Sequence, residues 1–226
     1  MAHVFEKLTV EALYHYPEHT MAWDYLTGFT YPWEALDGLK NFILELGATL
    51  PKDLYDEVKE GVWVAKSATV APTASIGAPA IIGENAEVRQ CAFIRGSALV
   101  GNGCVVGNSV ELKNCILFDG VQVPHFNYVG DSILGYLSHM GAGAVTSNVK
   151  SDKPPVSVRV DGEVLNTGRK KFGAMLSDHV EVGCNSVLNP GTVIGECSNV
   201  YPLSSVRGYV PSNSIFKSQS CIVEKE

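Results

Sequence analysis

The sequence contains no run of eighteen apolar residues, so no segment of its 226 residues is expected to span a membrane. Positive charge is also scarce. The 17 Lys and Arg residues stand against 24 Asp and Glu residues, and the formal net charge of -7 at pH 7 argues against a general nucleic-acid binder. The N-terminus lacks a basic region followed by an apolar stretch and a small-residue cleavage site, so we expect no secretion signal. These absences predict a cytoplasmic protein without nucleic-acid or membrane partners.

The six cysteines form no CxxC pair, a spacing that commonly marks a zinc or redox site. One of them, Cys104, occupies a position where neighbouring repeats carry alanine, and a thiol packs there like a small hydrophobic group. We therefore expect reduced structural thiols and no bound metal.

One stretch of the chain repeats with a period of six residues. An aliphatic or aromatic residue returns at every sixth position, and a small residue stands two positions before most of them. This period is typical of a solenoid whose short strands each send one large side chain inward. Three such edges predict eighteen residues per coil, with neighbouring coils about 4.8 Å apart. The members of this inward row are Val64, Val70, Ile76, Ile82, Val88, Ile94, Val100, Val106, Leu112 and Phe118.

Residues 1 to about 60 lack this period and are expected to form a helical segment. Pro32 is suited to open a helix, and Gly47 is placed to end it. The apolar residues between them fall on one face, which must pack either on the solenoid or on a neighbouring subunit. An earlier helix is expected around Val10 to Tyr16.

Two cations lie one predicted coil apart. Arg95 and Lys113 are eighteen residues apart, so they are expected to occupy the same slot in neighbouring coils. Two stacked cations repel each other, and on an acidic protein they suggest a bound anion such as a phosphate. The alternative is a pair of unrelated, solvated surface charges.

The repeat slips after Phe118, where the next clear members of the row are Leu134 and Met140. Their spacing predicts four extra residues between about 119 and 128, and hence a loop that leaves the coil. This loop carries His125. A single histidine is often only a surface residue, but loops on rigid scaffolds are where functional residues concentrate, so His125 is a candidate catalyst.

A second, larger interruption runs from about residue 147 to 175. Alternating valines end at Asp161-Gly162, a pair typical of a two-residue turn, so a β-hairpin arm is expected to project from the solenoid. The arm returns through Arg169-Lys170-Lys171, which either hold a phosphate or are solvated charges at the base of the arm.

The inward row then resumes. We predict a helical segment at 1–60, a solenoid at 61–210 with this insertion, and a C-terminal tail at 211–226.

Five motifs stand out: Phe93-Ile94-Arg95-Gly96, Val110-Glu111-Leu112-Lys113-Asn114, the run from His125 to Asp131, Gly141-Ala142-Gly143, and Asn148. Together they resemble the acetyltransferase half of the bifunctional sugar-1-phosphate nucleotidylyltransferase/glucosamine-1-phosphate acetyltransferases, from about residue 76 to 210. The resemblance implies a mainly β fold, a left-handed parallel β-helix of hexapeptide repeats with a short N-terminal helical segment and a β-hairpin insertion.

The resemblance also implies a function, an acetyl-CoA-dependent N-acetyltransferase acting on an amino-sugar phosphate in UDP-N-acetylglucosamine biosynthesis, with acetyl-CoA as co-substrate and a homotrimer as the assembly. An amino sugar must lose a proton before it attacks a thioester, which suits a histidine that titrates near pH 7. The implied roles are catalysis by His125, substrate binding by Arg95, Lys113, Tyr128, His139 and Asn148, and coenzyme binding by Ala142, Lys170, Lys171 and Cys184.

The chain departs from the family pattern in two ways. His139 and Val149 stand where better-known members carry an asparagine and a tyrosine, so the substrate is open. Residues 1–60 are too few for a nucleotide-binding domain and contain no glycine-rich G-x-G-T-R-like loop, so we expect no nucleotidylyltransferase activity from this polypeptide.

Two other functions compete with acetyl transfer. The first is a non-catalytic β-helix that assembles or regulates a separate sugar-1-phosphate nucleotidylyltransferase, with the N-terminal helices as its docking surface. The second is a zinc enzyme of the carbonic-anhydrase type, a β-helix trimer with three histidines, for which His125, His139 and His179 are available. The flanking residues match the acetyltransferases better.

Overall fold

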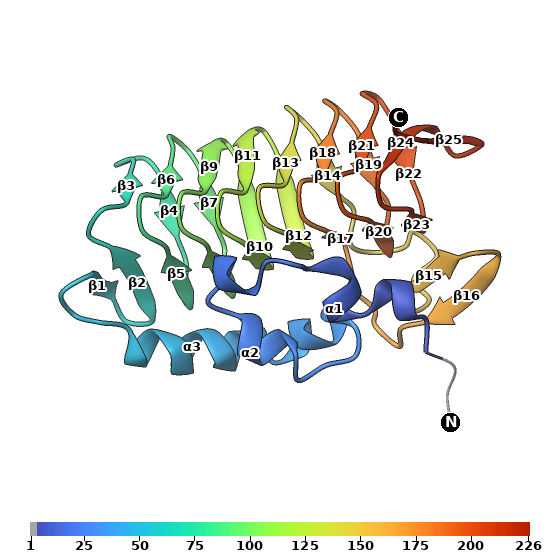
Figure 1. The fold of residues 1–226 in the computed structure, drawn as a ribbon. Coiled ribbons are helices and arrows are strands. Elements are labelled where there is room, and N and C mark those ends of the chain that lie inside the picture. Colours follow the sequence, from blue (N-terminus) through green and yellow to red (C-terminus); the bar gives the residue numbers. More distant parts are fainter. Residues whose placement is uncertain (1–3) are drawn as a thin grey trace.

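The computed structural model describes residues 4–226, which form a solenoid of stacked coils with helices along one side (Figure 1). None of the helices in this part of the chain is long and apolar enough to cross a membrane. The helices that precede the solenoid are η1 (Glu6–Leu8), α1 (Val10–Leu13), η2 (Pro17–His19), α2 (Trp23–Leu26), η3 (Pro32–Asp37) and α3 (Leu39–Thr49), where η marks a 3₁₀ helix.

Short parallel strands give the solenoid three faces. The first holds β2 (Val62–Ala65), β5 (Ala80–Ile82), β8 (Ala98–Val100), β17 (Ala174–Leu176), β20 (Thr192–Ile194) and β23 (Tyr209–Val210). The second holds β3 (Thr69–Val70), β6 (Glu87–Val88), β9 (Val105–Asn108), β11 (Gln122–His125), β13 (His139–Met140), β18 (Glu181–Val182), β21 (Asn199–Val200) and β24 (Ser214–Ser218). The third holds β4 (Ser75–Ile76), β7 (Phe93–Ile94), β14 (Val145–Thr146), β19 (Val187–Leu188) and β22 (Ser205–Val206), while β10 (Glu111–Leu117) and β12 (Tyr128–Leu134) turn the corner from the third face to the first.

The first coils have the predicted length. Ala80 pairs with Val62 below it and with Ala98 above it, eighteen residues away in each direction. The inward row is buried from Ile82 onward, with 1% or less of each member exposed, whereas Val64, Val70 and Ile76 are partly buried. Stacked parallel coils of this length are those expected of the β-helix that the resemblance implies to be left-handed, so the predicted fold class is confirmed.

The prediction of a loop at residues 119–128 is wrong, because the chain continues along the coil in this segment. β10 and β12 pair in parallel with Glu111 opposite Tyr128, and β9 and β11 pair with Val105 opposite Gln122. These partners are seventeen residues apart. The slip in the repeat is therefore one residue lost at each of two corners, and not four residues gained in a loop.

The shortened corner also changes which residue points inward. Leu117, and not Phe118, pairs with Val100 and takes the inward position. Phe118 is buried instead beneath the N-terminal segment, where its ring centroid lies 4.9 Å from that of Tyr14. The inward row therefore follows the predicted positions only as far as Leu112. The next inward residue is Leu117, one position before the predicted Phe118.

The first face carries a second apolar row on its outer side. Helix α3 packs against β5, β8 and β10, and η3 packs against β12. The predicted apolar helix face therefore packs on the solenoid of the same chain, and it is not free as the docking surface that the assembly hypothesis requires. The buried members of this outer row are Ile81, Leu99, Ile116, Ile133, Met175 and Val193, each 1% exposed or less.

Gly47 has a different role from the one predicted. It does not end the helix, because α3 continues to Thr49. A Cβ atom at position 47 would lie 2.2 Å from the ring of Trp63, so glycine allows the helix to contact this ring on β2. The glycine therefore marks a close contact between the N-terminal segment and the first coil.

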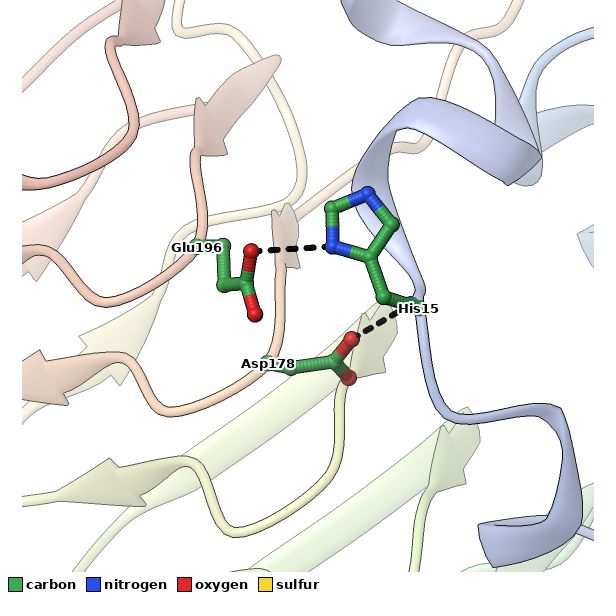
Figure 2. A group of neighbouring side chains, drawn as sticks. All are labelled: His15, Asp178 and Glu196. Atoms are coloured by element: carbon green, nitrogen blue, oxygen red, sulfur yellow. Dashed lines mark hydrogen bonds and ion pairs between the residues drawn. The ribbon is translucent and has the colours of Figure 1, made fainter.

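A hydrogen-bonded group of three side chains attaches the N-terminal segment to later coils (Figure 2). Asp178 accepts hydrogen bonds from the backbone N–H groups of His15 and Tyr136, each at 2.7 Å. The His15 ring lies 2.9 Å from a carboxylate oxygen of Glu196. Burial raises the pKa of the Asp178 carboxyl, and the two N–H groups act against this shift. The group connects three segments that are distant in sequence.

The insertion forms the predicted β-hairpin, β15 (Ser157–Val160) and β16 (Glu163–Asn166), but the hairpin does not simply project from the solenoid. Val156, Val158 and Val160 are buried. A Cβ atom on Gly208 would lie 2.7 Å from the carbonyl oxygen of Arg159, so the arm lies directly against the last coil. The alternating valines need an apolar partner, and the coil surface supplies it.

The chain after residue 210 closes the end of the solenoid. β24 stacks in parallel on β21, with Phe216 opposite Val200, and adds a last edge to the second face. β25 (Cys221–Glu224) then folds back and pairs antiparallel with β24. At the other end β1 (Tyr55–Lys59) pairs antiparallel with β2.

We expect Asp178→Asn to lower the free energy of unfolding by about 1–3 kcal/mol, because an amide has one acceptor oxygen where the carboxylate serves two N–H donors. Urea denaturation measures this change. Asp53→Asn, at an exposed aspartate, is the matched control and should leave the free energy of unfolding nearly unchanged. Equal unfolding midpoints for the two variants would contradict the role given to Asp178.

Candidate active site

Asp131 is the centre of a buried polar network at the corner where β12 leaves the third face. Only 2% of this residue is exposed. Both of its carboxylate oxygens lie 3.0 Å from the ammonium nitrogen of Lys113. The side-chain amides of Asn114 and Asn148 also donate to it. A buried carboxylate with three donors is a fixed negative charge that holds these side chains in one arrangement.

The short corners place these groups. Asn114 and Asp131 both have a φ of 50°, the left-handed conformation that Asn and Asp tolerate better than most residues. They occupy equivalent positions in coils that pair with a spacing of seventeen residues. The corner between Leu112 and Leu117 is one residue shorter than the regular repeat. This shortening aligns Asn114 with Asp131 in the next coil.

Tyr128 is joined to this network through Asn148, whose amide nitrogen donates to the phenol oxygen at 3.1 Å. The phenol lies over Gly130, where a Cβ atom would be 2.4 Å from its oxygen. Burial raises the pKa of the Tyr128 phenol, with smaller contributions from the charges of Asp131 and Glu111. The phenol is therefore neutral near pH 7 and can donate a hydrogen bond.

Arg95 and Lys113 stack as predicted. Ile94 pairs with Leu112 in the neighbouring coil, and each cation is the next residue along the chain. Neither charge stands alone, however. Arg95 lies 2.8 Å from a carboxylate oxygen of Glu111, and Lys113 is paired with Asp131. An anion at this position must therefore share these cations with two carboxylates, which the spacing alone did not predict.

His125 lies at the end of β11, three residues before Tyr128, and its side chain is exposed. Its backbone N–H donates to the side-chain oxygen of Asn127 at 3.1 Å. Asn127 is buried and donates in turn to the carbonyl oxygens of Gly141 and Ala144. The corner that carries His125 is thus held rigidly from inside the solenoid while the imidazole faces solvent.

Ala142 and Cys184 stack on His125 in successive coils. The backbone N–H of Gly143 donates to the His125 carbonyl oxygen at 3.0 Å, and that of Asn185 donates to the Ala142 carbonyl oxygen at 2.9 Å. The predicted catalytic residue and two predicted coenzyme residues therefore form one column on one edge of the solenoid.

Lys170 and Lys171 lie in a different place from Ala142 and Cys184. They line a cavity of about 470 Å³ together with Asn114, Asp131 and Gly168. The neighbouring Arg169 is not free, because it lies 2.7 Å from a carboxylate oxygen of Asp37. The two lysines therefore face the Asp131 network, at the root of the hairpin arm.

His139 is not part of the Asp131 network. It lies on β13 of the second face, and its ring nitrogen is 2.8 Å from a carboxylate oxygen of Glu181. Within residues 4–226, His15, Asp178 and Glu196 form a group close enough to share a metal ion, whereas His125, His139 and His179 do not. The Asp178 oxygens of that group already accept two backbone N–H bonds.

No role was expected for Asp131, Asn114 or Asn127 from the sequence. The signal for the first two was present in the repeat, because the inward row advances by five residues from Leu112 to Leu117 and again from Val129 to Leu134. Asn127 could have been noticed because it stands two residues before the inward Val129, where the repeat carries a small residue. A polar side chain at this buried position needs hydrogen-bond partners.

The chain is similar to curated proteins over about half of its length, while no family model matches it. The "bifunctional sugar-1-phosphate nucleotidylyltransferase/acetyltransferase" of Sulfurisphaera tokodaii is 36% identical over 108 residues, which are 48% of this chain and 27% of that protein. The "bifunctional protein GlmU" of Methanococcus maripaludis is 31% identical over 117 residues, 51% of this chain and 28% of that protein. The matched segments span less than a third of these relatives, and the resemblance predicted from the motifs is confirmed.

Solved structures with a similar arrangement share little sequence with the chain. The acetyltransferase domain of PglB from Neisseria gonorrhoeae, in complex with acetyl coenzyme A, has a TM-score of 0.35 and 16% identity over 74% of this chain and 59% of that chain. A mutant of AntD, an N-acyltransferase from Bacillus cereus in complex with dTDP and coenzyme A, has a TM-score of 0.35 and 19% identity over 72% of this chain and 84% of that chain. Both scores lie below 0.5, and neither likeness carries an argument about this chain.

We expect Asp131→Asn to lower the free energy of unfolding by about 3 kcal/mol, because it leaves the ammonium group of Lys113 without its buried counter-charge. In the double variant Lys113→Gln/Asp131→Asn the loss should be smaller than the sum of the two single losses by at least about 1 kcal/mol. Chemical denaturation of the four proteins completes this cycle. Additive losses would show that the two side chains do not stabilise each other.

Proposed function

We propose that this chain is an acetyl-CoA-dependent N-acetyltransferase acting on an amino-sugar phosphate of the glucosamine-1-phosphate type. The observation that carries the proposal is the network of Lys113, Tyr128, Asn148 and Asp131, which lies three residues along the chain from the exposed His125. The names of the matched relatives support the same chemistry. We propose no nucleotidylyl transfer for these residues, since the segment before the solenoid consists of short helices that cover the first face.

His125 is the proposed general base. The amine of the sugar is protonated near neutral pH and must lose this proton before its nitrogen attacks the thioester carbonyl. An exposed imidazole on a rigid corner suits this role, because histidine is the side chain that most often serves as a general base. The new N–C bond gives a tetrahedral intermediate, the C–S bond then breaks, and the coenzyme leaves as a thiol after its sulfur takes up the proton that His125 removed from the amine. The backbone N–H of Ala142, one coil away from His125, is the proposed donor to the developing oxyanion.

The proposed sugar site is the Asp131 network and the cavity beside it. The Tyr128 phenol and the Asn148 amide offer hydrogen bonds to sugar hydroxyl groups. Lys170 and Lys171 line the cavity without an ion pair to any described residue, so they are suited to the phosphate. Arg95 extends the cationic side of the site. His139 lies on another face, so we propose that it contacts the sugar only through a second subunit.

The proposed assembly is a homotrimer with active sites between subunits, as the resemblance implies. The outward column of the third face supports a partner there: Phe93 is 47% exposed and Val187 is 38% exposed. Tyr128 lies in the same column. A second copy packed on this face would cover these apolar side chains and enclose the site.

His125→Ala is expected to lower the rate of acetyl transfer to glucosamine-1-phosphate by at least about a hundredfold, because the amine then loses its base. Thiol release from acetyl-CoA measures the rate. The matched control is His179→Asn, since asparagine tolerates the positive φ of 56° at that position, which is outside the proposed site. Activity that survives in His125→Ala would remove this residue from the mechanism.

Val187→Asp is expected to convert the assembly to monomers, since a carboxylate in the centre of an apolar contact loses its hydration without gaining a partner. Light scattering coupled to size-exclusion chromatography measures the mass. Leu54→Asp, at a residue 42% exposed in the N-terminal segment, is the control that should leave the mass unchanged. A monomeric wild-type protein would refute the proposed trimer.

A further inference from the structure

The column that contains Arg95 and Lys113 holds a third cation near the other end of the solenoid. On the third face, Ile94, Leu112 and Val129 stack in register, and Thr146, Leu188 and Val206 continue the stack. The residue after each inward member therefore occupies one slot, which repeats from coil to coil. From Arg95 onward the occupants of this slot are Arg95, Lys113, Gly130, Ser147, Asn189 and Arg207.

Arg207 differs from the other two cations in its charge balance. Arg95 and Lys113 are each paired with a carboxylate, but the Arg207 guanidinium has no ion pair with any residue of the described chain. Its backbone is nevertheless held in place, because the Gln219 side chain accepts from its N–H at 3.2 Å and donates to its carbonyl oxygen at 3.3 Å. A fixed backbone thus presents an unpaired guanidinium at the surface.

Lys150 adds a second unpaired cation to the same place. It comes from the start of the insertion, and it lines a cleft of about 380 Å³ together with Arg207 and Asn189. Asp152 is the one acidic residue in the lining, so the two cations leave the cleft with a net positive charge. A guanidinium and an ammonium group that line one cleft, with a single carboxylate and no ion pair to it, are suited to a phosphate, which Arg binds through two parallel hydrogen bonds.

Asn148 separates two cationic cavities. The cavity with Lys170 and Lys171 adjoins Asp131, which accepts a hydrogen bond from Asn148. The cleft with Lys150 and Arg207 is lined by Ser147 and Val149, the two chain neighbours of Asn148. A transfer between two phosphate-bearing substrates needs two anion sites with the reacting groups between them.

We propose that the cleft of Lys150 and Arg207 binds a phosphate group of the acyl donor, coenzyme A. This inference rests on the proposed function and assigns the donor to a part of the chain that the motifs did not reach. Arg207 lies two coils beyond Ser147, which is roughly 10 Å along the solenoid axis at the usual strand spacing. Coenzyme A carries its phosphates at the end of a long flexible arm, so they are bound at a distance from the thioester.

Isothermal titration calorimetry of the full chain tests the proposal with three probes: coenzyme A, pantetheine, which lacks phosphate, and glucosamine-1-phosphate. We expect Arg207→Gln and Lys150→Gln each to weaken binding of coenzyme A by about tenfold or more, the loss of one charge-assisted hydrogen bond. Binding of pantetheine and glucosamine-1-phosphate should stay as in the wild type. Arg159→Gln, at an exposed arginine of β15 without an ion pair in the described chain, is the matched control and should change none of the three affinities.

Two results would overturn the proposal while leaving the proposed function intact. One is a double variant Lys150→Gln/Arg207→Gln that transfers acetyl groups and binds coenzyme A within about twofold of the wild type. The other is a loss of affinity that falls on glucosamine-1-phosphate instead, which would assign the cleft to the sugar phosphate. A wild-type protein that neither binds coenzyme A nor transfers acetyl groups would refute the proposed function together with this inference.

Discussion

The hydrogen bonds between neighbouring coils are the constraint on which the rest of the structure depends. They bring residues seventeen or eighteen positions apart into vertical columns, so a functional site can be built from one residue in each of several coils. His125 and Ala142 share one such column, and Arg95 and Lys113 share another. Each side chain is positioned by a backbone that its neighbours above and below hold in place. A site of this kind is rigid, which favours chemistry that depends on the orientation of a base and an oxyanion donor.

The faces of the solenoid have different tasks because their outer surfaces differ. The first face carries an outer row of aliphatic residues, and this row recruits the N-terminal helices and the hairpin as a cover. The third face keeps polar groups such as Glu111 and Tyr128 among exposed apolar residues, and the N-terminal helices leave it open. The cover therefore does more than stabilise the coils. Its hairpin returns through Lys170 and Lys171, which reach the edge of the open face beside Asp131.

Much of the candidate site could be predicted from the sequence, because a solenoid converts distance along the chain into position. The structure joins Lys113, Tyr128 and Asn148 in one network and stacks Arg95 beside it. The counter-charges could not be read from the repeat. Whether a carboxylate pairs with a cation depends on side chains from different coils, and the lost corner residue places Asp131 opposite Asn114, one position beyond the partner of Lys113. The loss of one residue at each of two corners also explains why the predicted loop is wrong, because a period continued past Phe118 assigns the wrong residues to the core.

The sequence by itself determined the solenoid, its inward row and the slots in which residues stack, since the size of each side chain in a six-residue repeat decides which of them can face a narrow interior. Only the tertiary structure decided which cations are neutralised. Arg95, Lys113 and Arg207 occupy equivalent slots, but Glu111 and Asp131 reach the first two, whereas no described carboxylate forms an ion pair with the third. Burial follows from local pattern, while charge balance depends on groups that folding brings together from distant parts of the chain.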